Sequence, residues 1–181
     1  MSHLPTDLST NLSTDLFTDL EARGLIHQVT SPELAKRLRA GPLTLYCGFD
    51  PTADSLHLGH LLPLLTLRRF QLAGHKPIAV LGGATGMIGD PSFKSQERLL
   101  LEPEQIQLNI QGIRSDISHF LDLEGPRAAL ILNNSDWFQG LSCLDFLRDV
   151  GKHFTVNHLI GKESIRARLE DREHGISYTE F

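Results

Sequence analysis

Two histidines, His57 and His60, stand three residues apart in the segment CGFDPTADSLHLGH, with Gly59 between them. Residues three apart on a helix lie on the same side, so both imidazoles would face one direction near a helix start. A helix N-terminus carries unpaired N–H groups and a partial positive charge, which favour phosphate. Two imidazoles there could donate hydrogen bonds to phosphate oxygens while negative charge develops during a transfer reaction. Gly59 would leave room for a flat base against the backbone.

Zinc binding is the alternative for this histidine pair. Zinc-binding histidines on a helix usually stand four apart and enclose a glutamate, and neither condition holds here. The two cysteines of the chain, Cys47 and Cys143, form neither a disulfide framework nor a zinc motif. We therefore expect no metal site, and we expect the protein to work in a reducing compartment.

A glycine-rich segment, LGGATGMIGDPS, follows an apolar run and places Gly83, Gly86 and Gly89 in a G-x-x-G-x-x-G spacing. The dinucleotide-binding turn of a dehydrogenase is one interpretation. Such a turn should follow the first strand and lead directly into a helix, whereas Pro91 disturbs a helix here and Asp90 would set a carboxylate beside phosphate. A carboxylate at close range instead suits the ammonium group of an amino acid. The segment therefore favours an amino-acid pocket over a nicotinamide cofactor.

Strands and helices alternate along the chain and must position these groups. Apolar runs predict strands over residues 43–49, 76–83 and 128–134. The alternation predicts an α/β fold, a Rossmann-like parallel sheet flanked by helices, in which ligands gather at the carboxyl ends of the strands. The expected helices span residues 31–41, 56–74, 103–121, 144–151 and 155–172, together with one from about Asp15 to Gly24.

Several local expectations accompany this assignment. Ser31 should cap a helix that starts at Pro32. Pro63 should bend its helix unless it lies in the first turn, where a missing N–H costs little. The second strand is mostly apolar and should be buried on both faces.

The chain begins with a tetrapeptide repeat, PTDL-STNL-STDL-FTDL, whose leucines would form one stripe on a helix but whose threonines and aspartates disfavour a helix interior. We expect residues 1–14 to be a disordered extension and residues 15–181 to form one domain.

The composition limits the kind of protein. The chain has 181 residues, of which 40% are hydrophobic and 22% charged, as is ordinary for one globular domain that buries its own core. A net charge of −5 gives no overall signature of nucleic-acid binding. No targeting segment is evident, and the longest apolar stretch, near residues 61–67, is too short to span a bilayer. We expect a cytoplasmic protein without a membrane partner.

Longer strings make a more specific assignment possible. The segment PTADSLHLGH resembles the HIGH signature of class I aminoacyl-tRNA synthetases. In order along the chain, YCGFDPTADSLHLGH, GGATGMIGDPS, DWF, FLRDVGKHF and GISYTEF resemble the tyrosine-specific branch of that family, from about residue 15 to the last residue. The resemblance implies a tyrosine–tRNA ligase that uses ATP to form tyrosyl-adenylate and transfers the tyrosyl group to tRNA(Tyr). It also implies ATP as a substrate, with Mg²⁺, and no bound organic cofactor.

The resemblance assigns roles to individual residues. Tyr46 would reach the phenol of the substrate, although the residues alone allow a core tyrosine equally well. Lys94 and Arg98 would lie on a mobile loop that closes over the leaving pyrophosphate, although the residues alone favour an exposed surface turn. Asp90 would bind the amine of tyrosine. The tyrosine-binding residues would be Tyr46, Gly48, Asp50 and Asp90; the ATP-binding residues Cys47, Gly59, His57 and His60; and the catalytic residues Thr52, His57, His60, Lys94 and Arg98.

The family's sequence continues beyond the point at which this chain stops. The resemblance therefore predicts a truncated sheet without the second half of the nucleotide-binding fold, the KMSKS-like phosphate loop and the anticodon-binding region. We expect that this chain alone does not complete adenylation, and a non-catalytic ligand-binding or interaction fragment is the alternative function. The family works as a homodimer, whose contact we expect near residues 149–158 and Tyr178.

A basic stretch near the end of the chain has two interpretations. Lys162, Arg166, Arg168 and Arg172 could contact tRNA. Three acidic residues interleave with them, and such mixed charge is typical of a solvated helix face. The solvated face is the favoured interpretation.

Overall fold

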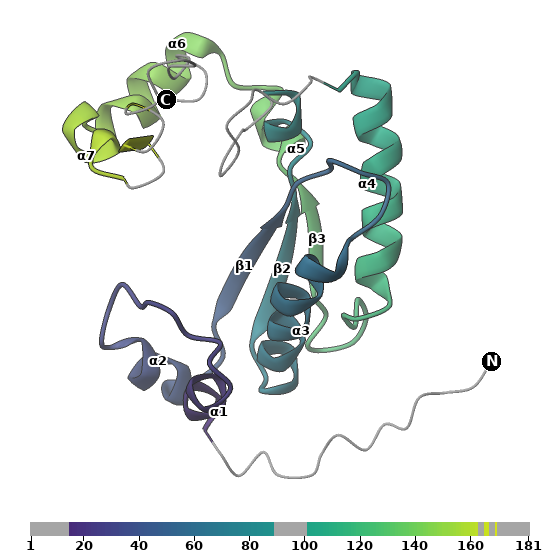
Figure 1. Cartoon of the computed structure of the whole chain (residues 1–181), viewed down its shortest axis with the longest axis vertical. Helices are drawn as coiled ribbons and strands as arrows, with labels where there is room; N and C mark the ends of the chain where they lie inside the picture. The colour runs from purple at the N-terminus through teal and green to yellow at the C-terminus, as the bar shows by residue number, and fades with distance from the viewer. Residues whose placement is uncertain (1–14, 89–100, 163–164, 167–168, 170–181) are drawn as a thin grey trace. The chain divides into compact units, whose positions relative to one another are not determined.

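The computed structural model describes residues 15–88, 101–162, 165–166 and 169. Three strands, β1 (Thr44–Phe49), β2 (Lys76–Leu81) and β3 (Leu130–Asn133), pair in the order β1-β2-β3 in this part of the chain (Figure 1). The Lys76 N–H donates to Leu43 C=O at the start of both strands, and the Gly82 N–H donates to Phe49 C=O at their ends. The starts of β1 and β2 lie side by side, and so do their ends, so the two strands are parallel. The predicted α/β fold is confirmed.

Helices separate and follow the strands, as the alternation predicted. None of the described helices combines the length and the apolar character needed to cross a bilayer. The described α-helices are α1 (Leu16–Ala22), α2 (Leu34–Ala40), α3 (Leu58–Leu72), α4 (Pro103–Ser118), α5 (Ser135–Phe138), α6 (Cys143–Asp145) and α7 (Val156–Ile160), with short 3₁₀ or π turns η1 (Thr85–Met87), η2 (Phe146–Val150) and η3 (Gly151–His153).

The chain divides into two compact units. The first unit comprises Met1–Cys47, Leu56–Ala79 and Arg114–Ile131. The second unit comprises Gly48–Ser55, Val80–Ile113 and Leu132–Phe181. Each unit is described by itself below.

The first predicted helix is confirmed at both ends. Asp15 caps α1, because its carboxylate accepts the Thr18 N–H at 3.3 Å. Gly24 ends the turn that follows the helix with φ = 67°, a conformation that glycine adopts without strain. Leu16 and Leu20 of the repeat are buried. The expected disordered extension, residues 1–14, lies outside the described residues.

The second helix starts later than predicted. The Ser31 hydroxyl accepts the Glu33 N–H at 3.3 Å, which closes a turn rather than capping a helix. As a result α2 begins at Leu34, two residues after the predicted start at Pro32. Gly41 stands at its C-cap, as predicted.

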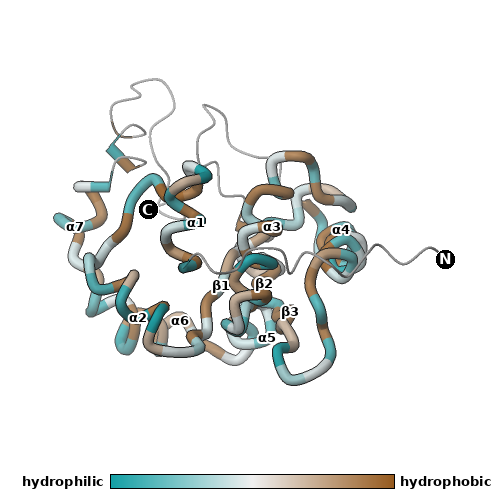
Figure 2. The backbone as a smooth tube through the Cα atoms, turned by 90° about the horizontal axis from the view of Figure 1, so that it is seen from below, coloured by the Kyte–Doolittle hydropathy of each residue, from teal (hydrophilic) through white to brown (hydrophobic). Residues whose placement is uncertain are grey.

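Helix α3 contains Pro63 in its second turn rather than in its first. A proline at this position withholds the N–H that would otherwise bond the Gly59 C=O, four residues earlier. The helix nevertheless continues to Leu72, and it buries Leu64 and Leu67 on one side. Helix α4 buries Ile106, Ile110, Ile113 and Ile117, which recur every three or four residues and therefore lie on one side of the helix. Figure 2 shows how hydrophobic and hydrophilic residues intermix along the backbone of the described chain.

One prediction about burial and two about helix length need correction. Pro77, Ala79 and Leu81 of β2 are buried, but Ile78 and Val80 on its other face are only half-buried, so the strand is not fully covered on both faces. The helix predicted over 144–151 passes from α6 into the π turn η2 and the 3₁₀ turn η3. The helix predicted over 155–172 is interrupted, because α7 ends at Ile160 with Gly161 as its C-cap. Most of the remaining residues of that stretch lie outside the described ranges.

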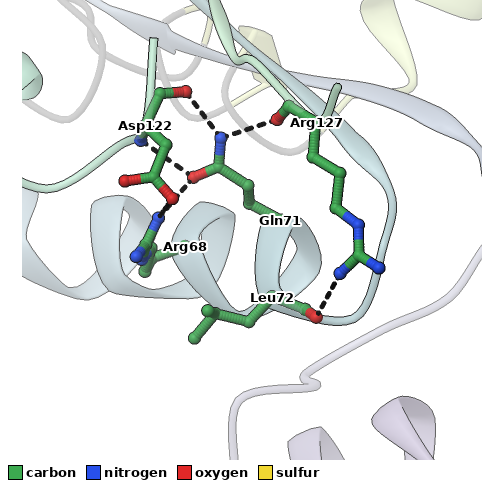
Figure 3. Close-up of polar contacts among 5 residues, drawn as sticks. All are labelled: Arg68, Gln71, Leu72, Asp122 and Arg127. Carbon is green, nitrogen blue, oxygen red and sulfur yellow. Dashed lines mark hydrogen bonds and ion pairs between the residues drawn. The ribbon is translucent and has the colours of Figure 1, made fainter. Parts of the chain in front are cut away.

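A buried amide, Gln71 of α3, ties this helix to the loop before β3 (Figure 3). Gln71 is 2% exposed, and its Nε2 donates to Asp122 C=O at 2.7 Å and to Arg127 C=O at 2.8 Å. Its Oε1 accepts the Asp122 N–H at 3.0 Å and the Arg68 guanidinium at 2.8 Å. The amide thus uses both donors and both acceptor positions, and Arg68 also pairs with the Asp122 carboxylate.

Replacement of Gln71 by leucine should destabilise the protein. Leucine leaves two carbonyl oxygens and one N–H of residues 122–127 without a partner. Because each buried polar group left unpaired costs about 1–3 kcal/mol, we expect the free energy of unfolding in urea to fall by at least about 2 kcal/mol. The exposed Gln111→Leu on α4 is the matched control. Equal, small effects of both exchanges would contradict this role of the Gln71 amide.

A second buried side chain, His75, stands at the start of β2. His75 is 4% exposed, and its Nδ1 accepts the Leu43 N–H at 3.1 Å. Its ring contacts Phe70, with 5.7 Å between the ring centroids. Burial lowers the pKa of His75 below its usual value, because desolvation disfavours the charged imidazolium. The neutral ring therefore stabilises the beginning of the β1–β2 pair.

The stability of the protein should depend on His75 in mildly acidic solution. The unfolded chain binds a proton at His75 at a higher pH than the folded protein does, so this contribution is complete above the unfolded pKa and is lost as the pH falls through the lowered folded pKa. We expect the free energy of unfolding in urea to fall less between pH 7.5 and pH 5.5 for His75→Asn than for the wild type. The amide oxygen of asparagine can still accept the Leu43 N–H. The exposed His119→Asn is the control. An identical pH dependence of the wild type and His75→Asn would refute the assignment.

Candidate active site

His57 and His60 form the start of α3 in the first unit. His57 is the N-cap, and its Nδ1 accepts the Gly59 N–H at 3.0 Å. The Nδ1 of His60 accepts the His57 N–H at 3.3 Å, which completes a reciprocal capping box. The two rings stack with centroids 3.8 Å apart and planes inclined by 27°. The prediction that both imidazoles lie on one side of the helix start is confirmed.

The capping bonds also select the tautomer of each imidazole. A neutral ring nitrogen that accepts a hydrogen bond carries no proton, so the proton of each neutral ring resides on Nε2. Each Nε2–H is then a donor group beside a helix N-terminus, which itself favours anions. The chemistry of the pair therefore suits an anionic ligand.

Gly59 has a local reason for being glycine. A Cβ at this position would lie 2.8 Å from Cε1 of His57, closer than real contacts allow. The imidazole of His57 thus lies against Gly59. The sequence predicts a base in this space. A flat ligand group against Gly59 requires this ring to turn aside.

Tyr46 and Cys47 of β1 belong to the first unit. Tyr46 is 76% exposed, so the interpretation as a core tyrosine is excluded and its hydroxyl is open to a ligand. Cys47 is half-buried, and desolvation raises the pKa of its thiol. The thiol is therefore less readily ionised than a free cysteine, which argues against a thiolate nucleophile at this position.

The end of β1, with Gly48, and the turn that follows it, with Asp50 and Thr52, lie in the second unit. The Thr52 N–H donates to Asp50 C=O at 2.9 Å, so the chain reverses tightly around the buried Pro51. The side chains of Asp50 and Thr52 are exposed. At Gly82, after β2, a Cβ would lie 2.7 Å from Oδ1 of Asp50. The acid at the end of β1 and the glycine loop at the end of β2 are therefore in direct contact.

The glycine loop after β2 depends on close backbone approaches within the second unit. A Cβ at Gly86 would lie 3.1 Å from Cγ of Pro51, and a Cβ at Gly83 would collide with the amide of Asn133. The loop continues into the single 3₁₀ turn η1 instead of a long helix. Gly82, Gly83 and Gly86 thus lie in close contact with residues at the ends of the neighbouring strands.

Asn133 and Asn134, at the carboxyl end of β3, were missed as site residues in the sequence. Oδ1 of Asn133 accepts the Gly83 N–H at 3.2 Å, and Oδ1 of Asn134 accepts the Ala84 N–H at 2.6 Å. These side chains occupy backbone N–H groups that a dinucleotide pyrophosphate would need, which argues against the dehydrogenase interpretation. The available signal was a pair of polar residues directly after an apolar strand.

The structure brings the expected residues together in two groups. His57, Gly59 and His60 meet in the first unit, and Asp50 meets the glycine loop in the second unit. Within the described ranges, no group of three or more His, Cys, Asp or Glu side chains is arranged to hold a metal ion. Asp90, Lys94 and Arg98 lie outside the described residues.

The chain is similar in sequence to proteins named tyrosine–tRNA ligase. The chain is 59% identical over 164 residues to a tyrosine–tRNA ligase of Serratia proteamaculans, and 58% identical over 164 residues to one of Yersinia enterocolitica. In both cases the matched part is 90% of this chain but only 39% of the relative. The chain therefore spans about two fifths of the length of these relatives.

A solved structure and a family model agree with these relatives. The fold matches a C-terminally truncated mitochondrial tyrosyl-tRNA synthetase of Aspergillus nidulans with a TM-score of 0.78 at 28% identity, over 92% of this chain and 50% of that protein. The model of the family described as tRNA synthetases class I (W and Y) matches residues 38–181. The chain therefore belongs to the class I tRNA synthetases of the tryptophan and tyrosine group.

Proposed function

We propose that this chain is the amino-terminal part of a tyrosine–tRNA ligase. The observation that carries the proposal is the capped helix start, where the rings of His57 and His60 stack and each accepts a backbone N–H through Nδ1. The chain belongs to this synthetase family, and its relatives are named tyrosine–tRNA ligase. We therefore infer that ATP is the anionic ligand and that tyrosine is the amino acid activated with ATP.

The proposed reaction has two steps. The carboxylate of tyrosine attacks the α-phosphorus of ATP, which forms the acyl-phosphate bond of tyrosyl-adenylate and breaks the bond to the oxygen of pyrophosphate. The terminal adenosine of tRNA(Tyr) then attacks the acyl carbon, and AMP leaves. No protein nucleophile is needed, so the side chains act by positioning the reactants and by stabilising developing charge.

The site residues divide between the two substrates in this proposal. His57, His60 and Thr52 hold the phosphates, and Cys47 contacts the ribose. Gly59 contacts the base once the His57 ring has turned aside. The exposed phenol of Tyr46 pairs with the hydroxyl of the substrate. A polar pairing of this kind, once buried by the substrate, discriminates against phenylalanine, and tyrosine-specific synthetases are themselves the established example of this effect. Gly48, Asp50 and Asp90 complete the tyrosine pocket, and Lys94 and Arg98 close over pyrophosphate.

ATP enters together with Mg²⁺ as part of the substrate. Magnesium in nucleotide-dependent enzymes is bound mainly by the phosphates and by one or two carboxylates, with water in the other positions. The exposed carboxylate of Asp50, at the carboxyl end of β1, is of the right type for such a contact. The ion neutralises charge on the phosphates when it is bound.

We extend the proposal to a homodimer in the cytoplasm. Apolar side chains are exposed in the second unit around the expected contact, with Leu144 at 78% and both Phe154 and Val156 at 56% exposure. An apolar surface of this kind supports a protein interface. Neither Cys47 nor Cys143 forms a disulfide in the described part of the chain, which supports a reducing compartment.

Removal of one imidazole should slow adenylation. We expect His60→Ala in the full-length gene product to reduce the rate of tyrosine-dependent ATP–pyrophosphate exchange by about 10²–10³, the effect of losing one preorganised donor of about 2.7–4 kcal/mol. His60→Gln should retain more activity, because glutamine keeps a capping acceptor and an N–H donor. His119→Ala, an exposed histidine outside the site, is the control. A rate for His60→Ala within threefold of the wild type would exclude the proposed role.

The isolated 181-residue chain should be inactive in the same assay. It spans only 39% of its ligase relatives, and we expect the rest of the active site to lie in the part of the relatives that it does not match. The measurement is pyrophosphate exchange by the chain alone beside the full-length gene product. A clear tyrosine-dependent signal from the chain alone would contradict this expectation. Tyrosine binding without exchange would support the alternative, a non-catalytic ligand-binding fragment.

A further inference from the structure

We propose that Asp116 of α4 is a positioning residue for the imidazoles of His57 and His60. This inference rests on the proposed function, because it concerns how the two rings are aimed at the phosphates of ATP. Oδ2 of Asp116 accepts the Leu56 N–H at 2.8 Å, and Leu56 directly precedes the N-cap His57. The carboxylate therefore holds the chain at the point where it enters α3.

The entry into a helix determines where its capping side chains point. The N-cap has an extended backbone, with φ = −95° and ψ = 171° at His57, so a small rotation before it swings its side chain away from the helix axis. A hydrophobic residue before the cap often packs against the fourth helical residue and fixes this entry. Leu56 and Leu61 occupy these two positions in α3. The sequence thus contains the elements of such a staple.

A cavity of about 270 Å³ lies beside these two leucines. Apolar contacts have no preferred direction, so they do not by themselves orient the N–H of Leu56. The directional hydrogen bond from this N–H to Asp116 supplies that restraint. The cavity is lined by Leu56, His57, Leu58, Leu61, Leu64, Asp116 and Phe120.

Two earlier positions on the same helix hold the preceding loop within the second unit. Asn109 is 2% exposed, and its Nδ2 donates to Pro51 C=O at 2.9 Å. At Gly112 a Cβ would collide with the backbone of Asp54, so only glycine allows this approach. Residues 109, 112 and 116 are spaced by three and four, which places them on one side of α4. All three residues contact backbone, and the position that Asp116 contacts, Leu56, directly precedes His57 in the sequence.

Steady-state pyrophosphate exchange by the full-length gene product tests this role. We expect Asp116→Ala to lower kcat by about tenfold to a hundredfold, the scale of a misplacement of about 1 Å, with the KM for tyrosine unchanged. Asp116→Asn should stay within threefold of the wild type, because its amide oxygen can accept the same N–H. The exposed Arg114→Ala on α4 is the matched control. If Asp116→Ala does not fold, Asp116→Glu takes its place with the same expected loss of kcat. Glutamate keeps the negative charge but moves the carboxylate oxygen away from its position against the Leu56 N–H.

A double-variant cycle separates positioning from general destabilisation. If Asp116 acts through the imidazoles, its exchange for alanine should cost little further rate in a His60→Ala background. An unchanged kcat for Asp116→Ala, an equal loss for Asp116→Asn, or losses that multiply independently in the double variant would each overturn the proposal.

Imidazole ¹H–¹⁵N correlation spectra give a readout that does not depend on activity. Asp116→Ala should shift the ring nitrogens of His57 and His60 and leave those of His75 in place. Unshifted rings of His57 and His60 would overturn the positioning role. If His60→Ala has no effect on exchange while the rings still shift, the proposed function of the pair fails and the positioning by Asp116 stands.

Discussion

Backbone N–H and C=O groups withdrawn from water need partners, and this requirement governs the loops of the protein. Several of these partners are side chains that are distant in the sequence. Gln71 binds the backbone of residues 122–127, Asn109 binds Pro51 C=O, and Asn134 binds the Ala84 N–H. An amide suits this task because it offers donors and acceptors and carries no charge whose burial would be costly. The loops that carry the candidate site are thereby held without regular secondary structure.

The same requirement shapes the start of α3, but there the partners are local. His57 and His60 satisfy two orphan N–H groups of the helix through Nδ1, and this capping places the proton of each neutral ring on Nε2. One pair of side chains therefore combines a structural and a chemical role. The close approach of the His57 ring to Gly59 follows from the cap and explains the glycine by packing.

Most elements could be predicted from the sequence because their signals are local. Asp15 and Gly24 mark the ends of α1 by side-chain capping and positive φ, and the apolar run before Gly82 marks β2. The errors arose where a local signal has two outcomes. Ser31 closes a turn instead of capping α2, and Gly161 ends α7 within a run that reads as one continuous helix. Competing local hydrogen bonds of similar strength decide such cases.

The sequence by itself determined the alternation of strands and helices, the histidine pair at a helix start and the likeness to a synthetase family, because each is written in contiguous residues. Only the tertiary structure decided that Asn133 and Asn134 hold the glycine loop and that Asp116 holds the entry to α3. These contacts join residues about 50 to 60 positions apart. Their partners are backbone atoms, which every residue carries, so the side-chain sequence contains no complementary signal for them.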